Sequence, residues 1–191
     1  MTNSWRGRRE PTTSELLLVN WLLVILRGVP VALVVFGGLL VHTFLRLFEF
    51  LFLGSRRSLT QSLTQIICKT SLTLLGISLK INGSPMTERG AVVANHSSWL
   101  DIFALNATQK IYFVAKSEVS GWPGIGWLAR ATGTVFIQRK ALQAHRQKSL
   151  FTERLLAGHK LLFFPEGTST DSLRVLPFKS SLFAAFFEEN M

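Results

Sequence analysis

The chain has 191 residues, enough for one domain with a sizeable core, and 48% of them are hydrophobic, with a mean hydropathy of +0.31. Its 21 Lys and Arg against 11 Asp and Glu give a net charge of +10, which favours an anionic partner such as lipid headgroups or a phosphorylated ligand. The single cysteine, Cys68, excludes an internal disulfide, and the basic residues are scattered without a recognition motif, so we expect no nucleic-acid partner.

Residues 1–55 are predicted to form a basic leader followed by a membrane anchor. The leader is polar, and from Leu16 to Leu53 the chain is almost entirely apolar. Its cleanest apolar stretch, Gly28–Leu45, is about the minimum length for a transmembrane helix. Arginines flank the segment on both sides, so the positive-inside rule selects no orientation. Two topologies stay open: a hairpin that bends near 28–30 or 37–38 and returns to the same face, and a single crossing.

Residues 56–80 are predicted to form an amphipathic linker helix that ends near Gly76. Its apolar positions recur at helical spacing and are expected to share one side of the helix: Leu59, Leu63, Ile66, Ile67, Thr70 and Leu74. That side would face either a protein core or a membrane surface, and the sequence does not decide between them.

After Gly76 the sequence changes to short strand-like runs separated by helical patterns. The strand-like runs are ISLKING, AVVANH, KIYFVAK, GTVFIQR and KLLFFPEG. Helical patterns cover residues 98–107, 140–157 and 178–189. This alternation predicts an α/β fold, with a mixed, mostly parallel sheet flanked by helices, preceded by the N-terminal membrane-embedded helical segment. Ligands of such sheets bind where strands end and helices begin, and the polar clusters of this sequence lie there.

The first polar cluster contains His96 and Asp101, which follow the strand-like run AVVAN. In one interpretation Asp101 fixes the tautomer of the imidazole, so that its other nitrogen can accept a proton. In the other, Ser98-x-x-Asp101 is a capping box that starts the next helix. The spacing alone favours neither interpretation.

A second cluster ends the run GTVFIQR, and a third ends KLLFFPEG. Arg139 at a strand end presents a fork-shaped donor suited to a phosphate oxygen, although arginine is common there on any surface. In the third cluster the apolar run breaks at Pro165, and Gly167 permits a tight turn beside Glu166. A polar turn is the simplest explanation, but the abrupt change to Pro-Glu-Gly favours a functional role.

Together the three clusters resemble the motifs of the membrane-bound glycerolipid acyltransferase family, which includes 1-acyl-glycerol-3-phosphate acyltransferases. The family's blocks are Asn-His-x4-Asp, Gly-x-x-Phe-Ile-x-Arg and Phe-Pro-Glu-Gly-Thr, and the resemblance covers residues 92 to about 186. The matching residues are, block by block, Asn95, His96 and Asp101; Gly133, Phe136, Ile137 and Arg139; and Phe164 to Thr168. Lys116 lies where the family has a Lys-x-Glu element.

The resemblance implies that residues 81–191 are an acyltransferase catalytic domain whose C-terminal part is missing. The implied reaction moves a fatty acyl group from acyl-CoA or acyl-carrier protein to the free hydroxyl of a lysophospholipid, as in the conversion of 1-acyl-glycerol-3-phosphate to phosphatidic acid. The implied place is the cytoplasmic membrane, with the catalytic face in the cytoplasm. We expect no cofactor and no metal, because the other histidines lack ligand partners in pattern.

The resemblance also assigns roles to residues. His96 is the general base, and Asp101 orients it. Lys116 is a candidate oxyanion or donor contact. The substrate-binding residues that it implies are Gly133, Phe136, Ile137, Arg139, Glu166, Gly167 and Thr168.

Two departures from the family pattern keep alternatives open. Ser169 and Thr170 stand where the family usually has Arg-Ser, which removes a cation near an acceptor phosphate and resembles the branch that acylates lyso-ornithine lipid. The family's fourth block is absent, so a non-catalytic membrane lipid-binding protein is the other alternative.

Overall fold

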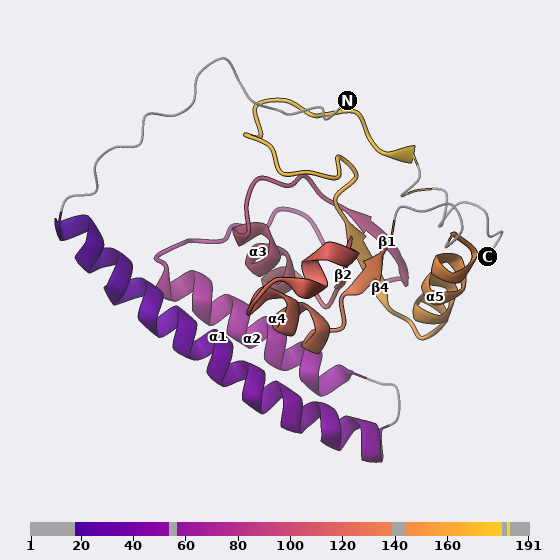
Figure 1. The fold of residues 1–191 in the computed structure, drawn as a ribbon, viewed down its shortest axis with the longest axis horizontal. Helices are drawn as coiled ribbons and strands as arrows, with labels where there is room; N and C mark the ends of the chain where they lie inside the picture. The colour runs from indigo at the N-terminus through magenta and orange to yellow at the C-terminus, as the bar shows by residue number, and fades with distance from the viewer. Residues whose placement is uncertain (1–17, 54–56, 139–143, 181–182, 184–191) are drawn as a thin grey trace.

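The computed structural model describes residues 18–53, 57–138, 144–180 and 183 (Figure 1). Its elements are α1 (Leu18–Phe52), α2 (Ser58–Leu74), β1 (Gly90–Val93), α3 (Leu100–Thr108), β2 (Tyr112–Lys116), the short 3-10 helix η1 (Ser117–Gly121), α4 (Ile125–Ala131), β3 (Val135–Ile137), α5 (Ala144–Leu156) and β4 (Lys160–Phe163). Two long helices therefore precede strands that alternate with helices, as the sequence predicted. Most of the helix predicted at 178–189 lies outside the described residues.

The four strands form one sheet in the order β1-β4-β2-β3, and each pair in it is parallel. The sequence predicted a mixed, mostly parallel sheet, and the described part is parallel throughout. The last strand among the described residues, β4, is inserted between β1 and β2. Parallel pairing brings the carboxyl ends of all strands to one edge, and the loops that leave this edge carry the three polar clusters.

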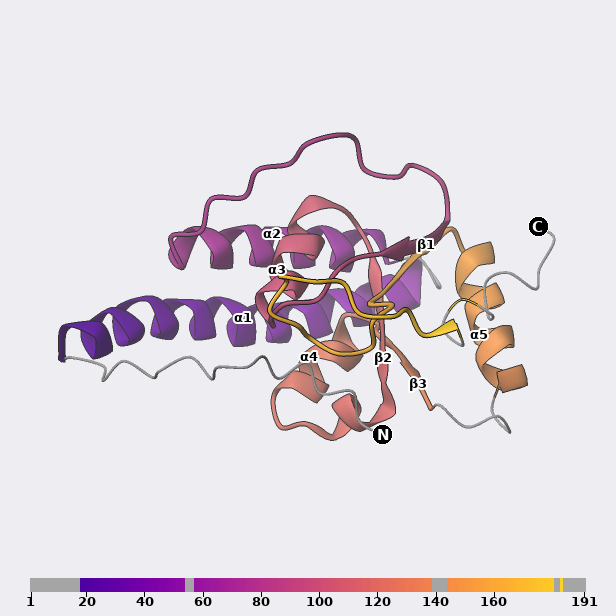
Figure 2. The ribbon, with the colours of Figure 1, turned by 90° about the horizontal axis from the view of Figure 1, so that it is seen from above.

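Helices cover both faces of the sheet because successive strand residues point to opposite sides. Val114 and Phe163 pack in the cluster that contains residues of α5, whereas Phe113 and Leu162 pack in the cluster that contains residues of α3. Figures 1 and 2 show α5 on one side of the sheet, and α3 and the α1–α2 pair on the other. The long helices therefore lie on the same face as α3.

The helix α1 is continuous across both positions at which the hairpin alternative could have bent. Pro30 lies inside the helix, and residues 37–38 keep helical geometry, so a hairpin with its bend at either position is excluded. In an apolar environment a broken helix exposes unsatisfied backbone groups at a cost of several kcal/mol, which favours an unbroken helix. The chain reverses after Phe52 instead, and α2 returns beside α1. Among the described residues, α1 is the one helix long and apolar enough to cross a membrane.

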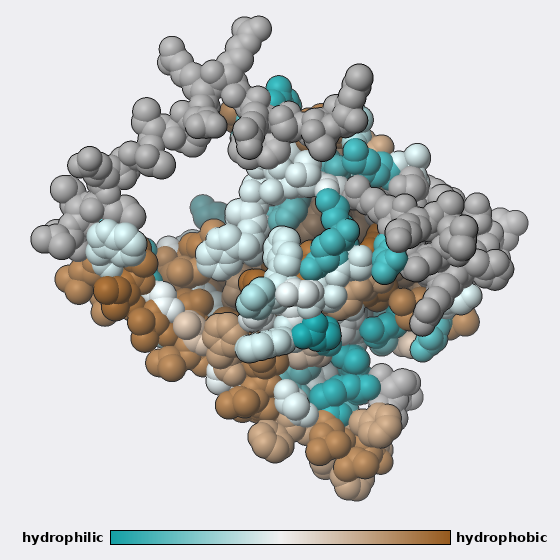
Figure 3. All heavy atoms as spheres, in the orientation of Figure 1, coloured by the Kyte–Doolittle hydropathy of each residue, from teal (hydrophilic) through white to brown (hydrophobic). Residues whose placement is uncertain are grey.

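The apolar side predicted for α2 is only partly covered by protein. Leu59, Ile66 and Thr70 are exposed, Leu63, Ile67 and Leu74 are half-buried, and the buried residues of this helix are Thr60, Cys68, Ser71 and Leu72. Small side chains let helices approach closely, as at Gly38 of α1, where an added Cβ would collide with Ile67. The apolar positions of α2 are therefore divided between the contact with α1 and an exposed side. Hydrophobic residues gather over α1 and α2 on the face shown in Figure 3.

Residues 77–83, predicted as a strand, form no strand. The segment is exposed, and Gly83 has a φ of 90°, which is unsuited to a strand. Within the described residues, β1 pairs with β4 alone, so no partner strand is available for this segment on the other edge. A short apolar sequence without a neighbouring strand has nothing to hydrogen-bond with and stays irregular.

Glu49 of α1 joins the two long helices. Its side chain is 0% exposed. One carboxylate oxygen accepts the backbone N–H groups of Leu59 at 2.7 Å and Thr60 at 3.1 Å, and the other accepts the Thr60 hydroxyl at 2.7 Å. Arg46 lies 3.6 Å from the same carboxylate. Glu49 thus caps the first turn of α2 from a neighbouring helix, where N–H groups have no partner inside the helix.

We predict that Glu49→Ala lowers the melting temperature of the detergent-solubilised protein by about 5–10 °C. Hydrogen bonds to a charged group contribute about 1.5–3 kcal/mol each, and roughly 1 kcal/mol corresponds to about 2–4 °C in a chain of this size. The exposed Glu153 of α5 provides the control, Glu153→Ala. Equal melting temperatures for the two variants would contradict the assigned role.

Candidate active site

The sheet order explains why the first and third clusters meet. His96 follows β1, residues 164–170 follow β4, and these two strands are hydrogen-bonded neighbours. The loops are also joined directly. The backbone N–H of Thr170 donates to the carbonyl oxygen of His96 at 2.8 Å, and the side-chain amide of Asn95 donates to Glu166 at 3.3 Å. The segment after β4 thus fixes the backbone that carries the imidazole.

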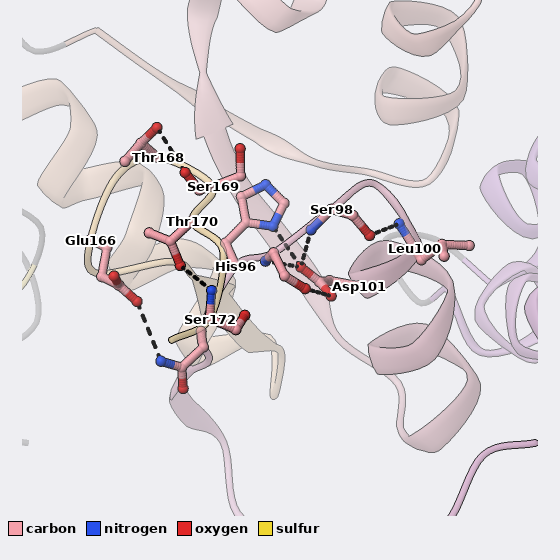
Figure 4. Close-up of polar contacts among 11 residues, drawn as sticks. His96, Ser98, Leu100, Asp101, Glu166, Thr168, Ser169, Thr170 and Ser172 are labelled. Carbon is pink, nitrogen blue, oxygen red and sulfur yellow. Dashed lines mark hydrogen bonds and ion pairs between the residues drawn. The ribbon is translucent and has the colours of Figure 1, made fainter. Parts of the chain in front are cut away.

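The structure brings His96 and Asp101 into contact. Nδ1 of His96 lies 2.8 Å from a carboxylate oxygen of Asp101, and the two side chains are 24% and 21% exposed. Figure 4 shows the second ring nitrogen pointing away from Asp101. A carboxylate on Nδ1 favours the tautomer with hydrogen on that nitrogen, which leaves Nε2 free to accept a proton.

Asp101 also accepts hydrogen bonds at the start of helix α3, so its carboxylate serves the helix as well as the contact with His96. The same carboxylate oxygen accepts the backbone N–H groups of Ser97 at 2.7 Å and Ser98 at 3.0 Å, and the Ser98 hydroxyl accepts the N–H of Leu100 at 3.2 Å. Burial acts to raise the pKa of Asp101, but the hydrogen bonds from His96, Ser98 and Ser97 outweigh it, and the pKa lies below its ordinary value. The carboxylate therefore stays ionised at neutral pH.

The imidazole rests on an aromatic ring from the third cluster. His96 and Phe164 are stacked, with centroids 4.0 Å apart and an interplanar angle of 13°. Phe164 is also 6.0 Å from Phe113 of β2. The ring of His96 is therefore held by a carboxylate at one edge and by an aromatic face beneath it, which limits its rotation.

Glu166 is buried between the loops of the first and third clusters. It is 2% exposed, and its two oxygens accept the Asn95 amide and, at 2.9 Å, the backbone N–H of Leu176. Figure 4 shows its side chain on the loop that also carries Thr168, Ser169 and Thr170. The resemblance implied that Glu166 binds substrate, and in this structure each of its oxygens has a partner inside the protein.

The second cluster lies farther from His96. It belongs to β3, which is three strands from β1, roughly 14 Å at the usual strand spacing. Ile137 lines the cavity described below, and Phe136 is half-buried beside it in the strand. Arg139 lies outside the described residues. The structure therefore does not bring the described residues of the second cluster into contact with the first.

Gly133 lies at the opposite, amino-terminal side of β3 and has a backbone role. Its φ of 82° follows the end of α4, where its N–H donates to Arg130 and the next N–H donates to Ala129. Its carbonyl accepts Arg154 at 3.0 Å, and a Cβ would lie 2.7 Å from a guanidinium nitrogen of Arg57. These contacts explain glycine at this position without a substrate.

A cavity of about 810 Å³ extends from His96 across the face of the sheet. Its lining is mainly apolar and comes from α1, α2, α3, α4, the strands and the loop after β4. Lys116, Gly167 and Thr168 line it at the carboxyl ends of the strands, as does Ser169. Such a volume fits a ligand with a large apolar part.

The candidates for an oxyanion contact differ in availability. Lys116 is exposed at the end of β2 and lines the cavity. The N–H of Gly167 donates to the carbonyl oxygen of Phe164 at 3.0 Å and closes the turn, for which its φ of 71° requires glycine.

Burial raises the pKa of Cys68, another cavity residue, to about 12, which argues against a thiolate nucleophile. Within the described ranges, no three His, Cys, Asp or Glu side chains cluster as metal ligands.

The sequence interpretation missed the supporting roles of Asn95, Phe164 and Thr170. Asn95 and Phe164 were in matching blocks, and an aromatic residue before Pro-Glu-Gly was a usable signal for a ring beside the histidine. Thr170 acts through its backbone N–H, which no side-chain motif reveals.

A histidine–carboxylate pair at the carboxyl edge of a parallel sheet, beside a long apolar cavity, defines the class of protein. The model of the family described as Acyltransferase matches residues 79–189, more than half of the chain. The chain therefore belongs to the acyltransferase family.

Individual members of the family are similar to this chain in sequence or in structure. Over 187 residues the chain is 49% identical to the lyso-ornithine lipid O-acyltransferase of Rhodobacter capsulatus, covering 98% of this chain and 68% of that protein. It is 40% identical over 119 residues to a 1-acyl-sn-glycerol-3-phosphate acyltransferase of Neisseria gonorrhoeae, covering 60% of this chain and 46% of that one. The crystal structure of the 1-acyl-sn-glycerophosphate acyltransferase PlsC of Thermotoga maritima superimposes with a TM-score of 0.64 at 27% identity, covering 88% of this chain and 69% of that chain.

Proposed function

We propose that this protein transfers a fatty acyl group from a thioester donor to the free hydroxyl of a lysolipid. The observation that carries the proposal is the His96–Asp101 contact at 2.8 Å, on the lining of a cavity large enough for an acyl chain. The relatives named as lysolipid acyltransferases support it. The complete pair and the cavity weigh against a non-catalytic lipid-binding protein.

The chemistry needs a base and no covalent enzyme intermediate. Nε2 of His96 accepts the proton of the lysolipid hydroxyl, and the oxygen attacks the thioester carbonyl carbon. The imidazolium that forms is stabilised by the Asp101 carboxylate. When the tetrahedral intermediate collapses, the carbon–sulfur bond breaks, and the imidazolium returns the proton to the leaving thiolate. Lys116, which lines the cavity, stabilises the oxyanion.

The acyl donor in this proposal is acyl-CoA or acyl-carrier protein. Both are polyanionic, which suits a chain of net charge +10.

The acceptor that we propose is lyso-ornithine lipid, with lysophosphatidate as the second candidate. The 49% identity to the Rhodobacter capsulatus enzyme supports the first, and the Neisseria gonorrhoeae and Thermotoga maritima relatives support the second. Ser169, which stands where the family usually has arginine, lines the cavity and offers no charge to a phosphate. This favours an acceptor without a phosphate.

We propose that the protein lies in the cytoplasmic leaflet of the cytoplasmic membrane, where a lysolipid and a cytoplasmic donor can meet. The helix α1 is about 50 Å long at the usual rise, and α4 lies against its middle, where Gly124 is next to Phe36. If α1 stood upright across the bilayer, α4 would be inside the hydrocarbon. Trp99 and Trp122 are exposed on the cavity lining, and tryptophan favours the membrane interface. A helix lying along one leaflet satisfies both observations.

The test is an acceptor panel with purified full-length protein in mixed micelles, using acyl-CoA and acyl-carrier protein as donors. We expect kcat/KM for lyso-ornithine lipid to exceed that for lysophosphatidate at least tenfold. Ser169→Arg should raise kcat/KM for lysophosphatidate about tenfold, because one added charge contact to a phosphate contributes on the order of 1.4 kcal/mol. Ser169→Gln is the matched control for size. Equal use of both acceptors by the wild type would overturn the acceptor assignment, and no transfer to either would overturn the function.

A further inference from the structure

The far end of the cavity contains polar groups that the proposed reaction does not use. Thr132 and Ala131 line the cavity and precede β3, so they lie near the amino ends of the strands. Lys116 ends β2 and His96 follows β1, so both lie at the carboxyl ends. The strand β3, from Val135 to Ile137, separates the two ends of the cavity. The polar groups at this far end are thus remote from the reacting atoms.

His42 of α1 is the central polar group there. It is 4% exposed and lines the cavity, and its Nδ1 is sealed from solvent without a hydrogen-bond partner among the described residues. Glu49, two turns further along α1, accepts hydrogen bonds from the start of α2, and Arg57, just before that helix, donates to the carbonyl of Ala131 at 3.3 Å. His42 therefore belongs to the end of the cavity at the amino ends of the strands.

Two further polar side chains lie on the same lining. Thr64 of α2 and Asn106 of α3 line the cavity, and Asn106 is 7% exposed. The helices α1 and α2 run antiparallel and touch at two places, Gly38 with Ile67 and Glu49 with Thr60. His42 and Thr64 lie between these two contacts, on the facing sides of the helices. An imidazole, a hydroxyl and an amide thus come from three helices to one apolar cavity.

The unpartnered nitrogen of His42 has a cost that an apolar residue would not have, whereas the Thr64 hydroxyl already donates to the carbonyl of Thr60 at 2.9 Å and keeps its oxygen as an acceptor. A buried polar atom without a partner destabilises a protein, whereas leucine at position 42 would fill an apolar wall. Because Nδ1 has no partner, the imidazole is most stable with its hydrogen on Nε2, which makes the ring a donor. An apolar chain gains nothing from such a donor, but a chain with a hydroxyl group does.

We propose that His42, Thr64 and Asn106 form a subsite that binds a hydroxyl group in the distal part of an acyl chain. The inference rests on the proposed function in taking this cavity as the acyl site. The hydroxyl accepts from the imidazole N–H and donates to the threonine or amide oxygen. The subsite selects hydroxylated chains over plain chains of equal length.

Binding of free fatty acids tests the subsite without catalysis. Full-length protein in detergent is titrated with palmitic acid and with a set of hydroxypalmitic acids that differ in hydroxyl position, in competition with a fluorescent fatty acid. We expect at least one distal hydroxy acid to bind about five-fold or more tightly than palmitic acid, since one net hydrogen bond corresponds to about that factor. The same acids with the hydroxyl near the carboxylate should show no such gain.

Two variants at position 42 test whether the preference for hydroxylated acids depends on the imidazole. His42→Leu should abolish the preference and raise the melting temperature, because it removes the unpartnered nitrogen. His42→Gln keeps a donor and should keep part of the preference. Equal binding of plain and hydroxylated acids by the wild type would overturn the subsite and leave a cavity that holds water there. A preference that survives in His42→Leu would overturn it too. Failure of every fatty acid to bind would instead overturn the proposed acyl cavity.

Discussion

His96→Ala is expected to reduce kcat for acyl transfer by about 10²–10⁴-fold, the range typical of a lost general base. The ring lines the cavity and is held by Asp101 and Phe164, so its removal takes away the proton acceptor and little else. The measurement is transfer of labelled acyl groups to lyso-ornithine lipid by full-length protein in mixed micelles. Fatty-acid binding should be unchanged within about two-fold, because the cavity remains.

His159→Ala is the matched control for this prediction. His159 lies against Tyr112 at the amino end of β4, and burial, with the charges of Arg154 and Arg57, lowers its pKa to about 4. It has no place in the proposed reaction, so its variant should keep kcat. Transfer by His96→Ala at the rate of His159→Ala would remove the basis of the mechanism.

Asp101→Asn is expected to lower kcat by on the order of 10²-fold or more with little change in either KM. The amide cannot stabilise the imidazolium, and its nitrogen can turn the ring to the wrong tautomer. The measurement is kcat and both KM values for acyl transfer by full-length protein in mixed micelles.

The capping role of Asp101 requires its own control. Ser98→Ala removes the hydroxyl that accepts the Leu100 N–H but leaves the contact between His96 and Asp101. This variant should lose about 1 kcal/mol of stability and keep kcat. If Ser98→Ala lowers kcat as much as Asp101→Asn, the carboxylate acts through the helix start and has no direct role with the imidazole.

The fold class and the contact between His96 and Asp101 followed from sequence because both depend on local patterns. Alternating apolar runs predicted the strands, and a five-residue step after a strand brings a helix N-terminus back to the histidine. The catalytic role of that contact is still a proposal. The insertion of β4 between β1 and β2 was not predictable, because each strand presents similar apolar residues and only long-range packing decides their order.

The hydrogen bonds of Glu166 that join the loops could not be predicted from the sequence, for a different reason. The partners of Glu166 are Asn95, 71 residues away, and a backbone N–H at Leu176, so they depend on the completed sheet. The sequence left the surroundings of α2 open because apolar periodicity reports only which side of a helix avoids water. In the structure half of those apolar positions are exposed, and hydroxyl and small side chains such as Thr60 and Ser71 pack inward.

The position of β4 has a consequence for synthesis of the protein. Within the described residues, β1 hydrogen-bonds to β4 alone, and 66 residues separate Val93 from Lys160 when counted between them. While the ribosome makes that stretch, the nascent β1 has an unpaired edge beside an exposed apolar helix, a combination prone to aggregation. Early capture of α1 by the bilayer would shield the emerging chain until its final strand arrives.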